Sequence, residues 1–301
     1  MTKPKKACIS FAIGCPRSML DAARLVDFFK ENGWKTSTRI EEADMVLVAT
    51  CGVDVTHENK SMKYLSIADR KRRKDSSLIA FGCLPGINEP RLLNEFHLTP
   101  ITRRSFNRLD KMINAQVKIR EITIPNDLSG YRKHIIESFR RRERYFVEKE
   151  LEFSKEFCHK LLSIMKWGSI SGLVRGLSYD NSYNYRSYEF YENHACFNVR
   201  IATGCDGSCS YCALRLVCGP LISCPLDIIV NVVRNGLSKG YKAIRLIAED
   251  VGSWGQDIGT DITALLRELF RNDESFKLLF DDFSPRWLVK YFPELLDIFV
   301  E

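Results

Sequence analysis

The chain has 301 residues, of which 45% are hydrophobic and 11% aromatic, and its formal net charge at pH 7 is +7. Such a chain can bury one large core or two ordinary ones, so the composition predicts a globular protein. The sequence has no apolar run near the length of a membrane span, and its lysine-rich start MTKPKK lacks the apolar stretch of a secretory signal. We therefore expect a cytoplasmic protein that does not contact a membrane.

The first 98 residues alternate strand and helix patterns, which predicts a βαβ domain with a parallel sheet. The predicted strands are KACISFAI, MVLVAT and SLIAFG, and the predicted helices span residues 18–32 and 56–74.

Each of these three strands ends at a cysteine, namely Cys15, Cys51 and Cys83. The carboxyl ends of parallel strands open on one edge of a sheet, so the three thiols should converge there. The sequence has 11 cysteines, and the cytosol keeps thiols reduced, so we interpret this trio as metal ligands. The alternative is that they are three small buried residues of the core.

The pattern loosens over residues 99–193, which we interpret as a linker or insertion. Within it, Cys158 and His159 lie in a helical pattern and are interpreted as structural. Two basic runs, RKRRK at residues 70–74 and RRRER at residues 140–144, fit solvated helix ends. The second run has aromatic neighbours, so nucleic-acid stacking is its alternative interpretation.

A second α/β series occupies residues 194–301. ACFNVRIATG, KAIRLIAED and FKLLFDDF are its predicted strands, and residues 225–239 and 261–271 are its predicted helices. A loop with the pattern CxxxCxxC follows the first of these strands and places Cys205, Cys209 and Cys212 within eight positions.

Three thiolates in one loop suit a [4Fe–4S] cluster, which then keeps one iron open to a small molecule. A structural zinc site instead needs four protein ligands, so it would require Cys218 or Cys224 as well. A plain iron–sulfur electron carrier is the third interpretation.

The stretch GCDGSCSYC resembles the radical S-adenosylmethionine signature, with Tyr211 at its aromatic position. This resemblance implies that Cys205, Cys209 and Cys212 hold a [4Fe–4S] cluster whose open iron binds S-adenosylmethionine. It also implies that residues 194–301 form the first half of a radical S-adenosylmethionine (βα) barrel. Glu249 and Asp250 end the next strand, where they would bind the cofactor's amine or ribose, unless they are solvated loop acids.

With Cys15, Cys51 and Cys83 included, the chain resembles the methylthiotransferases. The likeness covers residues 6–86 and 194–287, in the blocks GCPRSMLD, EEADMVLVATCG, IAFGCLPG and EDVGSWGQDIG. It implies a second [4Fe–4S] cluster on the early trio and an enzyme that replaces a carbon-bound hydrogen with a methylthio group, using two molecules of S-adenosylmethionine and an electron donor.

The resemblance leaves the substrate open between two branches of the family. GCPRSMLD resembles the branch that modifies a ribosomal protein, and AEDVGSWGQDIG resembles the branch that modifies an adenosine beside a tRNA anticodon. The basic excess favours tRNA, with a protein or peptide substrate as the alternative. A non-catalytic iron–sulfur or zinc-binding relative is a further alternative.

Two departures from the family bear on activity. The Arg-Gly pair that usually follows the third cysteine is Cys218-Gly219 here. The sequence also offers about three of the six barrel strands that the family implies, and the edge of an open half-barrel would be apolar. Three interpretations follow: a fragment, a divergent protein whose barrel is completed by a partner or by self-association, or a degenerate form with little activity, and the chain's catalytic competence stays open between them.

Overall fold

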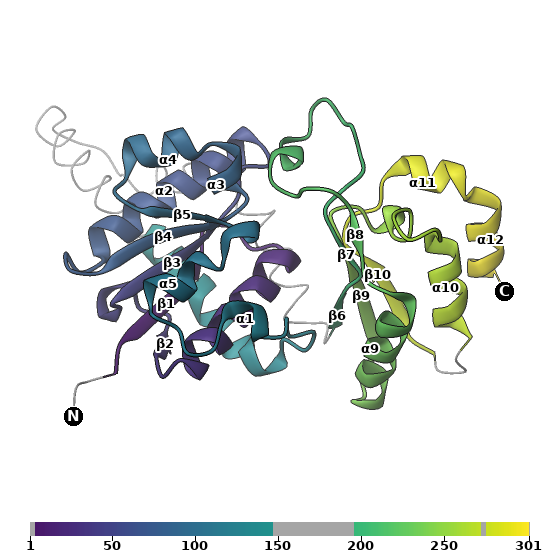
Figure 1. The fold of residues 1–301 in the computed structure, drawn as a ribbon, viewed down its shortest axis with the longest axis horizontal. Helices are drawn as coiled ribbons and strands as arrows, with labels where there is room; N and C mark the ends of the chain where they lie inside the picture. The colour runs from purple at the N-terminus through teal and green to yellow at the C-terminus, as the bar shows by residue number, and fades with distance from the viewer. Residues whose placement is uncertain (1–3, 147–195, 272–274, 301) are drawn as a thin grey trace, which may run out of the picture.

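The computed structural model describes residues 4–146, 196–271 and 275–300. They form two α/β lobes that lie side by side, a first lobe of residues 4–146 and a second lobe of residues 196–300 (Figure 1). Cys158 and His159 lie outside the described residues. None of the described helices is both long and apolar enough to cross a membrane.

The first lobe contains a parallel five-stranded sheet with the strand order β2-β1-β3-β4-β5. The predicted α/β fold with an N-terminal parallel sheet is thereby confirmed. Its central strand, MVLVAT, is buried at every position, as a strand covered on both faces should be. The strands are β1 (Lys6–Phe11), β2 (Lys35–Ser37), β3 (Met45–Thr50), β4 (Ser77–Gly82) and β5 (Thr99–Thr102).

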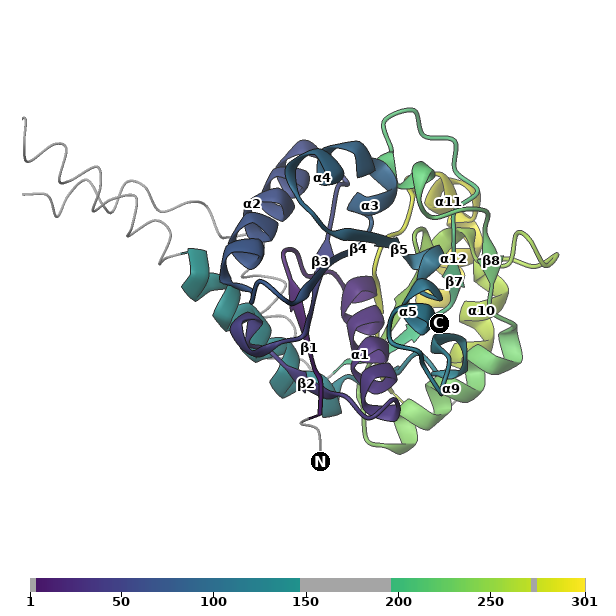
Figure 2. The ribbon, with the colours of Figure 1, turned by 60° about the vertical axis from the view of Figure 1, so that its left-hand side comes forward.

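Helices cover both faces of this sheet (Figure 2). Side chains alternate between faces along a strand, so Ile9 of β1 packs in one core with α1, and the neighbouring Cys8 packs in the other core with α2. The α-helices are α1 (Pro16–Glu31), α2 (Val55–Lys71), α3 (Leu84–Ile87), α4 (Glu89–Glu95) and α5 (Arg108–Met112). Short 3₁₀ helices are η1 (Ile40–Glu42), η2 (Arg103–Ser105), η3 (Ile119–Glu121) and η4 (Ser129–Tyr131).

The first lobe extends beyond residue 98, the boundary expected from the sequence. β5 begins at Thr99 and pairs with β4, and Ile101, Phe106 and Leu109 are buried in the same core as α1. The sequence analysis placed these residues in a linker because β5 is only four residues long and contains a proline.

Residues 132–146 are helical and cover the free edge of β1 beyond its short pairing with β2. The Ser138 hydroxyl donates to the Ile9 carbonyl at 3.0 Å, and the Arg142 guanidinium donates to the Ala12 carbonyl at 3.1 Å. Arg142 is buried, and its guanidinium lies over the ring of Phe139. Part of the RRRER run therefore serves the fold, because it satisfies carbonyls that an open strand edge would leave unpaired.

The second lobe has a parallel sheet with the strand order β10-β9-β6, and α9, α10 and α12 share a hydrophobic core with one of its faces. Its elements are β6 (Cys196–Arg200), β7 (Ala202–Thr203), η5 (Ala213–Leu216), β8 (Ile222–Ser223), α9 (Leu226–Ser238), β9 (Ala243–Ile247), η6 (Val251–Ser253), α10 (Ile262–Phe270), β10 (Lys277–Phe280), α11 (Pro285–Lys290) and α12 (Phe292–Val300). Arg200, at the end of β6, pairs with Asp21 of the first lobe. β9 is buried at every position and β6 at all but its last, so these two strands of the sheet are covered on both faces.

Gly82 fixes the spacing of two strand ends. Its φ is +110°, and a Cβ added there would lie 2.5 Å from the Thr50 carbonyl oxygen. Thr50 immediately precedes Cys51, and Gly82 immediately precedes Cys83. Only glycine permits this close approach of the two backbones, so it sets where both cysteines emerge.

We predict that Gly82→Ala lowers the free energy of unfolding by about 3 kcal/mol, because it adds both backbone strain and a clash. Gly33→Ala is the control: its φ is +75° but no atom lies within 4 Å of the added Cβ. That variant should lose only about 1 kcal/mol. Urea unfolding of the metal-free protein measures both, and equal losses would show that the approach to Thr50 is unimportant.

Candidate functional site

The structure brings the three early cysteines to the same edge of the first sheet. Cys51 and Cys83 directly follow β3 and β4, and Cys15 follows β1 at the start of α1. Burial, together with the charges of Cys83 and Cys15, raises the pKa of the Cys51 thiol to about 12. The three sulfur atoms therefore lie within electrostatic reach of one another.

Cys15 has a local structure suited to a thiolate. It is the N-cap residue of α1, and its Sγ accepts a hydrogen bond from the Ser18 N–H at 3.4 Å. The Ser18 hydroxyl in turn accepts from the Cys15 N–H at 3.0 Å, which completes a capping box. The positive end of the helix dipole favours a negative sulfur at this position.

Burial and nearby cations act in opposite directions on the same cysteines. Burial raises the pKa of Cys83 to about 11, whereas the charges of Arg103 and Arg17 lower it. A backbone hydrogen bond from Val53 likewise lowers the pKa of Cys51 against the effect of its burial. In the metal-free protein these two thiols are protonated at neutral pH, so a metal must displace their protons.

The second cysteine trio lies in the loop that joins β7 to the antiparallel β8. The Gly207 N–H donates to Cys205 Sγ at 3.2 Å, and Cys205 and Cys212 are half-buried, whereas Cys209 is exposed. Tyr211 is 88% exposed, and its hydroxyl bonds to Cys209, which raises the pKa of the tyrosine. The loop thus presents the sulfurs on a surface that a cofactor can reach.

The two cysteine loops meet where η5, which follows Cys212, contacts α3, which follows Cys83 (Figure 1). A Cβ added to Gly86 of α3 would lie 2.2 Å from Cγ1 of Val217. The absence of a side chain at Gly86 therefore lets the two loops pack directly together.

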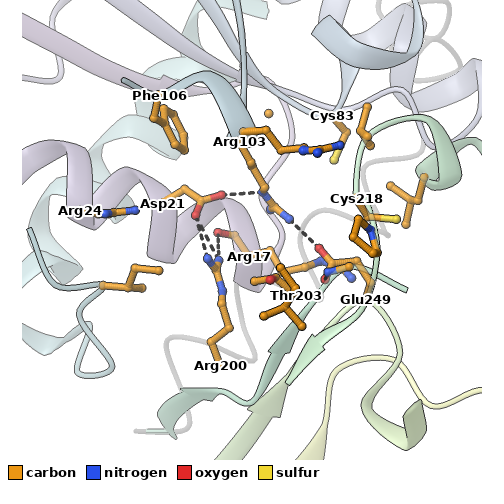
Figure 3. A pocket seen from close by; sticks show the side chains of 18 residues that line it. Arg17, Asp21, Arg24, Cys83, Arg103, Phe106, Arg200, Thr203, Cys218 and Glu249 are labelled. Atoms are coloured by element: carbon orange, nitrogen blue, oxygen red, sulfur yellow. Dashed lines mark hydrogen bonds and ion pairs between the residues drawn. The ribbon is translucent and has the colours of Figure 1, made fainter. Parts of the chain in front are cut away.

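A cavity of about 290 Å³ lies between the lobes and is lined by both of them (Figure 3). Cys83 stands on the side of the first lobe, and Gly204, Cys218 and Glu249 stand on the side of the second. Five arginines line the same cavity, namely Arg17, Arg24, Arg103, Arg104 and Arg200.

A network of buried ion pairs joins the lobes at this cavity. The Asp21 carboxylate lies 2.7 Å from Arg103 Nε and 3.1 Å from Arg200 Nη2, and Arg103 Nη1 lies 3.1 Å from Glu249 Oε1. Burial alone would raise the pKa of Asp21, but Arg103 and Arg200 outweigh it and lower that pKa. The carboxylate therefore stays charged and holds both arginines.

Arg17 forms a second bridge beside the first. Its guanidinium donates to the Ala248 carbonyl and to the Asp282 carboxylate of the second lobe, each at 3.0 Å.

The bridging arginines were not predicted from the sequence. Arg17 lies two residues after Cys15, which is a local signal, but Asp21 and Arg200 are 179 positions apart and no sequence pattern links them.

Both acids predicted to bind the cofactor have protein partners. Glu249 accepts from the Gly204 N–H at 3.0 Å and from Arg103, so it anchors the backbone directly before Cys205. Asp250 accepts from the Trp287 indole N–H at 2.8 Å and from the Ser284 N–H at 3.1 Å. The structure thus places Glu249 at the cavity and gives Asp250 a bracing position behind the loop.

A single-ion site is poorly supported at either trio. Among the described residues, the group with ligand atoms within 4.8 Å of one another is Cys205, Asp206 and Asp250. Arg286 donates to both of these carboxylates and so supplies the positive charge itself. A four-iron cluster attaches each cysteine to a different iron and accepts a wider spacing of sulfurs.

Most of the first lobe matches a known protein family. Residues 7–101 match the family described as Uncharacterized protein family UPF0004. The resemblance to methylthiotransferases is confirmed. A "Probable threonylcarbamoyladenosine tRNA methylthiotransferase" of Pyrococcus horikoshii is 25% identical over 95% of this chain and 55% of its own length. A ribosomal protein uS12 methylthiotransferase of Acetivibrio thermocellus is 25% identical over 84% of this chain and 47% of its own length.

A shorter match with higher identity comes from a Pyrococcus abyssi protein that is also described as a probable threonylcarbamoyladenosine tRNA methylthiotransferase. It is 38% identical over 34% of this chain and 24% of its own length. The chain spans about half the length of the curated relatives that it matches over most of its sequence.

We predict that Asp21→Asn lowers the free energy of unfolding at pH 7 by about 3 kcal/mol, because two partly buried arginines lose their shared buried partner. Urea unfolding measures the loss. Asp75→Asn is the control, since Asp75 pairs with Arg73 on the surface, where its side chain is 72% exposed. The control should be unchanged within error, and an equally small loss in Asp21→Asn would contradict the network's role.

The contribution of Asp21 to the free energy of unfolding should also depend on pH. The pKa of Asp21 is lowered in the folded protein, so its stabilisation is complete above the unfolded carboxyl pKa, about 3.9. This stabilisation is lost as the pH falls below the carboxyl pKa of the unfolded chain and through the lower pKa that Asp21 has in the folded protein. The difference in unfolding free energy between the native protein and Asp21→Asn should therefore be constant from pH 7 to about 5 and shrink below about 4. A difference that grows on acidification would contradict this.

Proposed function

We propose that this chain is a radical S-adenosylmethionine methylthiotransferase that inserts a methylthio group into a modified adenosine of tRNA. The observation that carries the proposal is the direct contact of two cysteine loops, one from each lobe, beside a shared cavity. Methylthio insertion needs sulfur chemistry and hydrogen abstraction at one target carbon, so two reactive centres must reach the same space. The related tRNA and uS12 methylthiotransferases support the class of reaction.

In this proposal Cys15, Cys51 and Cys83 hold the first [4Fe–4S] cluster. Their surroundings fit a negatively charged group with thiolate ligands. Ser18 and Val53 provide N–H donors to two of the sulfurs, and the charges of Arg17 and Arg103 act on the trio. Hydrogen bonds to the sulfurs and nearby cations are the means by which proteins stabilise such clusters.

Cys205, Cys209 and Cys212 are the proposed ligands of the second cluster. The Gly207 N–H provides the same kind of support to Cys205, and the exposure of Cys209 leaves an entry route. Loaded, this cluster would supply reductive cleavage of S-adenosylmethionine, with electrons from an external donor. We propose Tyr211, Glu249 and Asp250 as residues of the cofactor region, with Glu249 fixing the Gly204 backbone and Asp250 bracing the loop through Trp287.

The charge of the cavity supports a nucleic-acid substrate. Five arginines line it against the two carboxylates of Asp21 and Glu249. An excess of guanidinium groups suits the phosphates that flank a nucleotide. A ribosomal-protein substrate is the second candidate, favoured by the uS12 methylthiotransferase relatives. We further propose a cytoplasmic location.

Anaerobic reconstitution should load about eight irons per chain, four for each trio. Cys205→Ala should lose about half of the iron and all formation of 5'-deoxyadenosine, because the second cluster would be missing. Cys15→Ala should also lose iron but continue to form 5'-deoxyadenosine. Iron quantification and chromatography of the reaction products measure these outcomes. A preparation that binds one zinc and no iron would refute the proposal and favour a non-catalytic zinc protein.

Substrate identity is tested by mass spectrometry of nucleosides and of ribosomal peptides from cells with and without the gene. A methylthio-modified adenosine that disappears with the gene supports the proposal. A methylthio-modified peptide that disappears instead would replace tRNA by a protein substrate.

Gly86→Leu should separate the two cysteine loops, because its side chain would occupy the position of Val217. A misplacement of this size can reduce transfer about 100-fold. Iron content and 5'-deoxyadenosine formation should persist, since each trio remains intact. Gly130→Leu is the matched control, because no atom lies within 4 Å of its added Cβ. Equal product yields from both variants would contradict a functional contact between the loops.

A further inference from the structure

Cys218 lies next to the second cysteine trio although it stands outside the CxxxCxxC pattern. The start and the end of the cysteine loop contact each other here, because the Cys205 N–H donates to the Gly219 carbonyl at 3.2 Å. The Cys218 N–H donates to the Leu214 carbonyl at 2.9 Å and so ties Cys218 to η5. Its side chain borders the cavity together with Gly204 and Glu249 (Figure 3).

Two glycines permit this contact between the start and the end of the cysteine loop. Gly204 has a φ of +81°, and a Cβ added there would lie 1.8 Å from the Pro220 carbonyl oxygen. Gly219 has a φ of +73° and directly follows Cys218. Both conformations are ones that residues with side chains rarely adopt, so the local sequence fixes Cys218 opposite Cys205.

The charges that act on Cys218 also indicate that it lies near the cysteine trio. Burial raises the pKa of its thiol, and the charges of Glu249, Cys205 and Cys212 raise it further. Cys218 is therefore within electrostatic reach of two members of the trio.

Cys224, the other cysteine considered as an additional ligand, has different surroundings. It packs against the hydrophobic core of the second lobe, and its carbonyl accepts from the Trp254 indole at 2.9 Å. Burial and the charge of Asp227 raise the pKa of its thiol, and neither involves the cysteine loop. The structure thus separates two cysteines that the sequence left equivalent.

We propose that the Cys218 thiolate is a fourth ligand of the cluster bound by Cys205, Cys209 and Cys212. This inference rests on the proposed function, because it assumes a four-iron cluster in that loop. Cys218 would bind the iron that three-cysteine ligation leaves open. The resting site would then be closed by four protein ligands.

Binding of S-adenosylmethionine would be a ligand exchange. To bind iron, the Cys218 thiol would lose its proton to solvent and form an Fe–S bond. The amino and carboxylate groups of S-adenosylmethionine would displace the Cys218 sulfur from the iron, and the released thiolate would regain a proton. No oxidation state changes in either direction, so the exchange requires no further reactant. The closed state would protect the fourth iron until the cofactor arrives.

Oxidative loss of iron tests the proposal. A four-iron cluster with one iron lacking a protein ligand releases that iron on mild oxidation and leaves a paramagnetic [3Fe–4S] cluster. The experiment uses the full chain with Cys15→Ala, Cys51→Ala and Cys83→Ala, so that only the second cluster is observed. This parent, and the same chain with Cys218→Ala or Cys224→Ala, would be reconstituted anaerobically and oxidised with ferricyanide. Iron quantification and electron paramagnetic resonance then follow the cluster.

The parent and Cys224→Ala should keep about four irons per chain, whereas Cys218→Ala should fall to about three and show the three-iron signal. If S-adenosylmethionine is added before oxidation, Cys218→Ala should retain its fourth iron, because the cofactor then ligates that iron. If Cys218→Ala does not fold, Cys218→Ser preserves the size of the side chain and should lose the same iron.

Equal iron loss from the parent and Cys218→Ala would overturn the role of Cys218 and leave the proposed function standing. Equal retention of four irons by both would overturn it as well. A parent that assembles no cluster would overturn the proposed function and this inference together.

Discussion

One buried carboxylate, that of Asp21, binds arginines from both lobes. Asp21 of α1 holds Arg103 from its own lobe and Arg200 from the other, and its side chain is only 4% exposed. Arg103 then reaches Glu249, which accepts from the Gly204 N–H beside Cys205. A continuous series of contacts therefore runs from the sheet edge that carries the early cysteines to the loop that carries the late ones.

Burial determines how such a network acts. Removing charges from water costs free energy, so a buried ion pair adds little net stability even when breaking it is costly. Its effect is geometric: Asp21 contacts both Arg103 and Arg200 only when the lobes adopt this one arrangement. The glycine at position 86 and the contact of α3 with η5 fix the same arrangement by packing. Charge and shape thus specify one interface independently.

Under the proposed function, the surroundings of the early cysteines would couple cluster binding to proton release. Burial keeps the thiols of Cys51 and Cys83 protonated in the metal-free protein, whereas Arg17 and Arg103 favour the thiolate form that a cluster needs. The balance makes cluster binding a proton-releasing event, so assembly and pH are coupled. A fourth cysteine beside the late trio extends the same chemistry to the position where a cofactor would bind.

The sequence alone determined most of the strands and helices, and it predicts metal ligation by the clustered cysteines. Apolar runs such as MVLVAT predict buried parallel strands, and cysteines at strand ends and in CxxxCxxC predict metal ligation, because both are local patterns. Only the tertiary structure decided that β5 completes the first sheet, that Asp21 meets Arg200, and that Cys218 rather than Cys224 borders the cavity. Those facts depend on contacts between residues far apart in the chain, and such contacts leave no periodicity or spacing in the sequence from which they could be inferred.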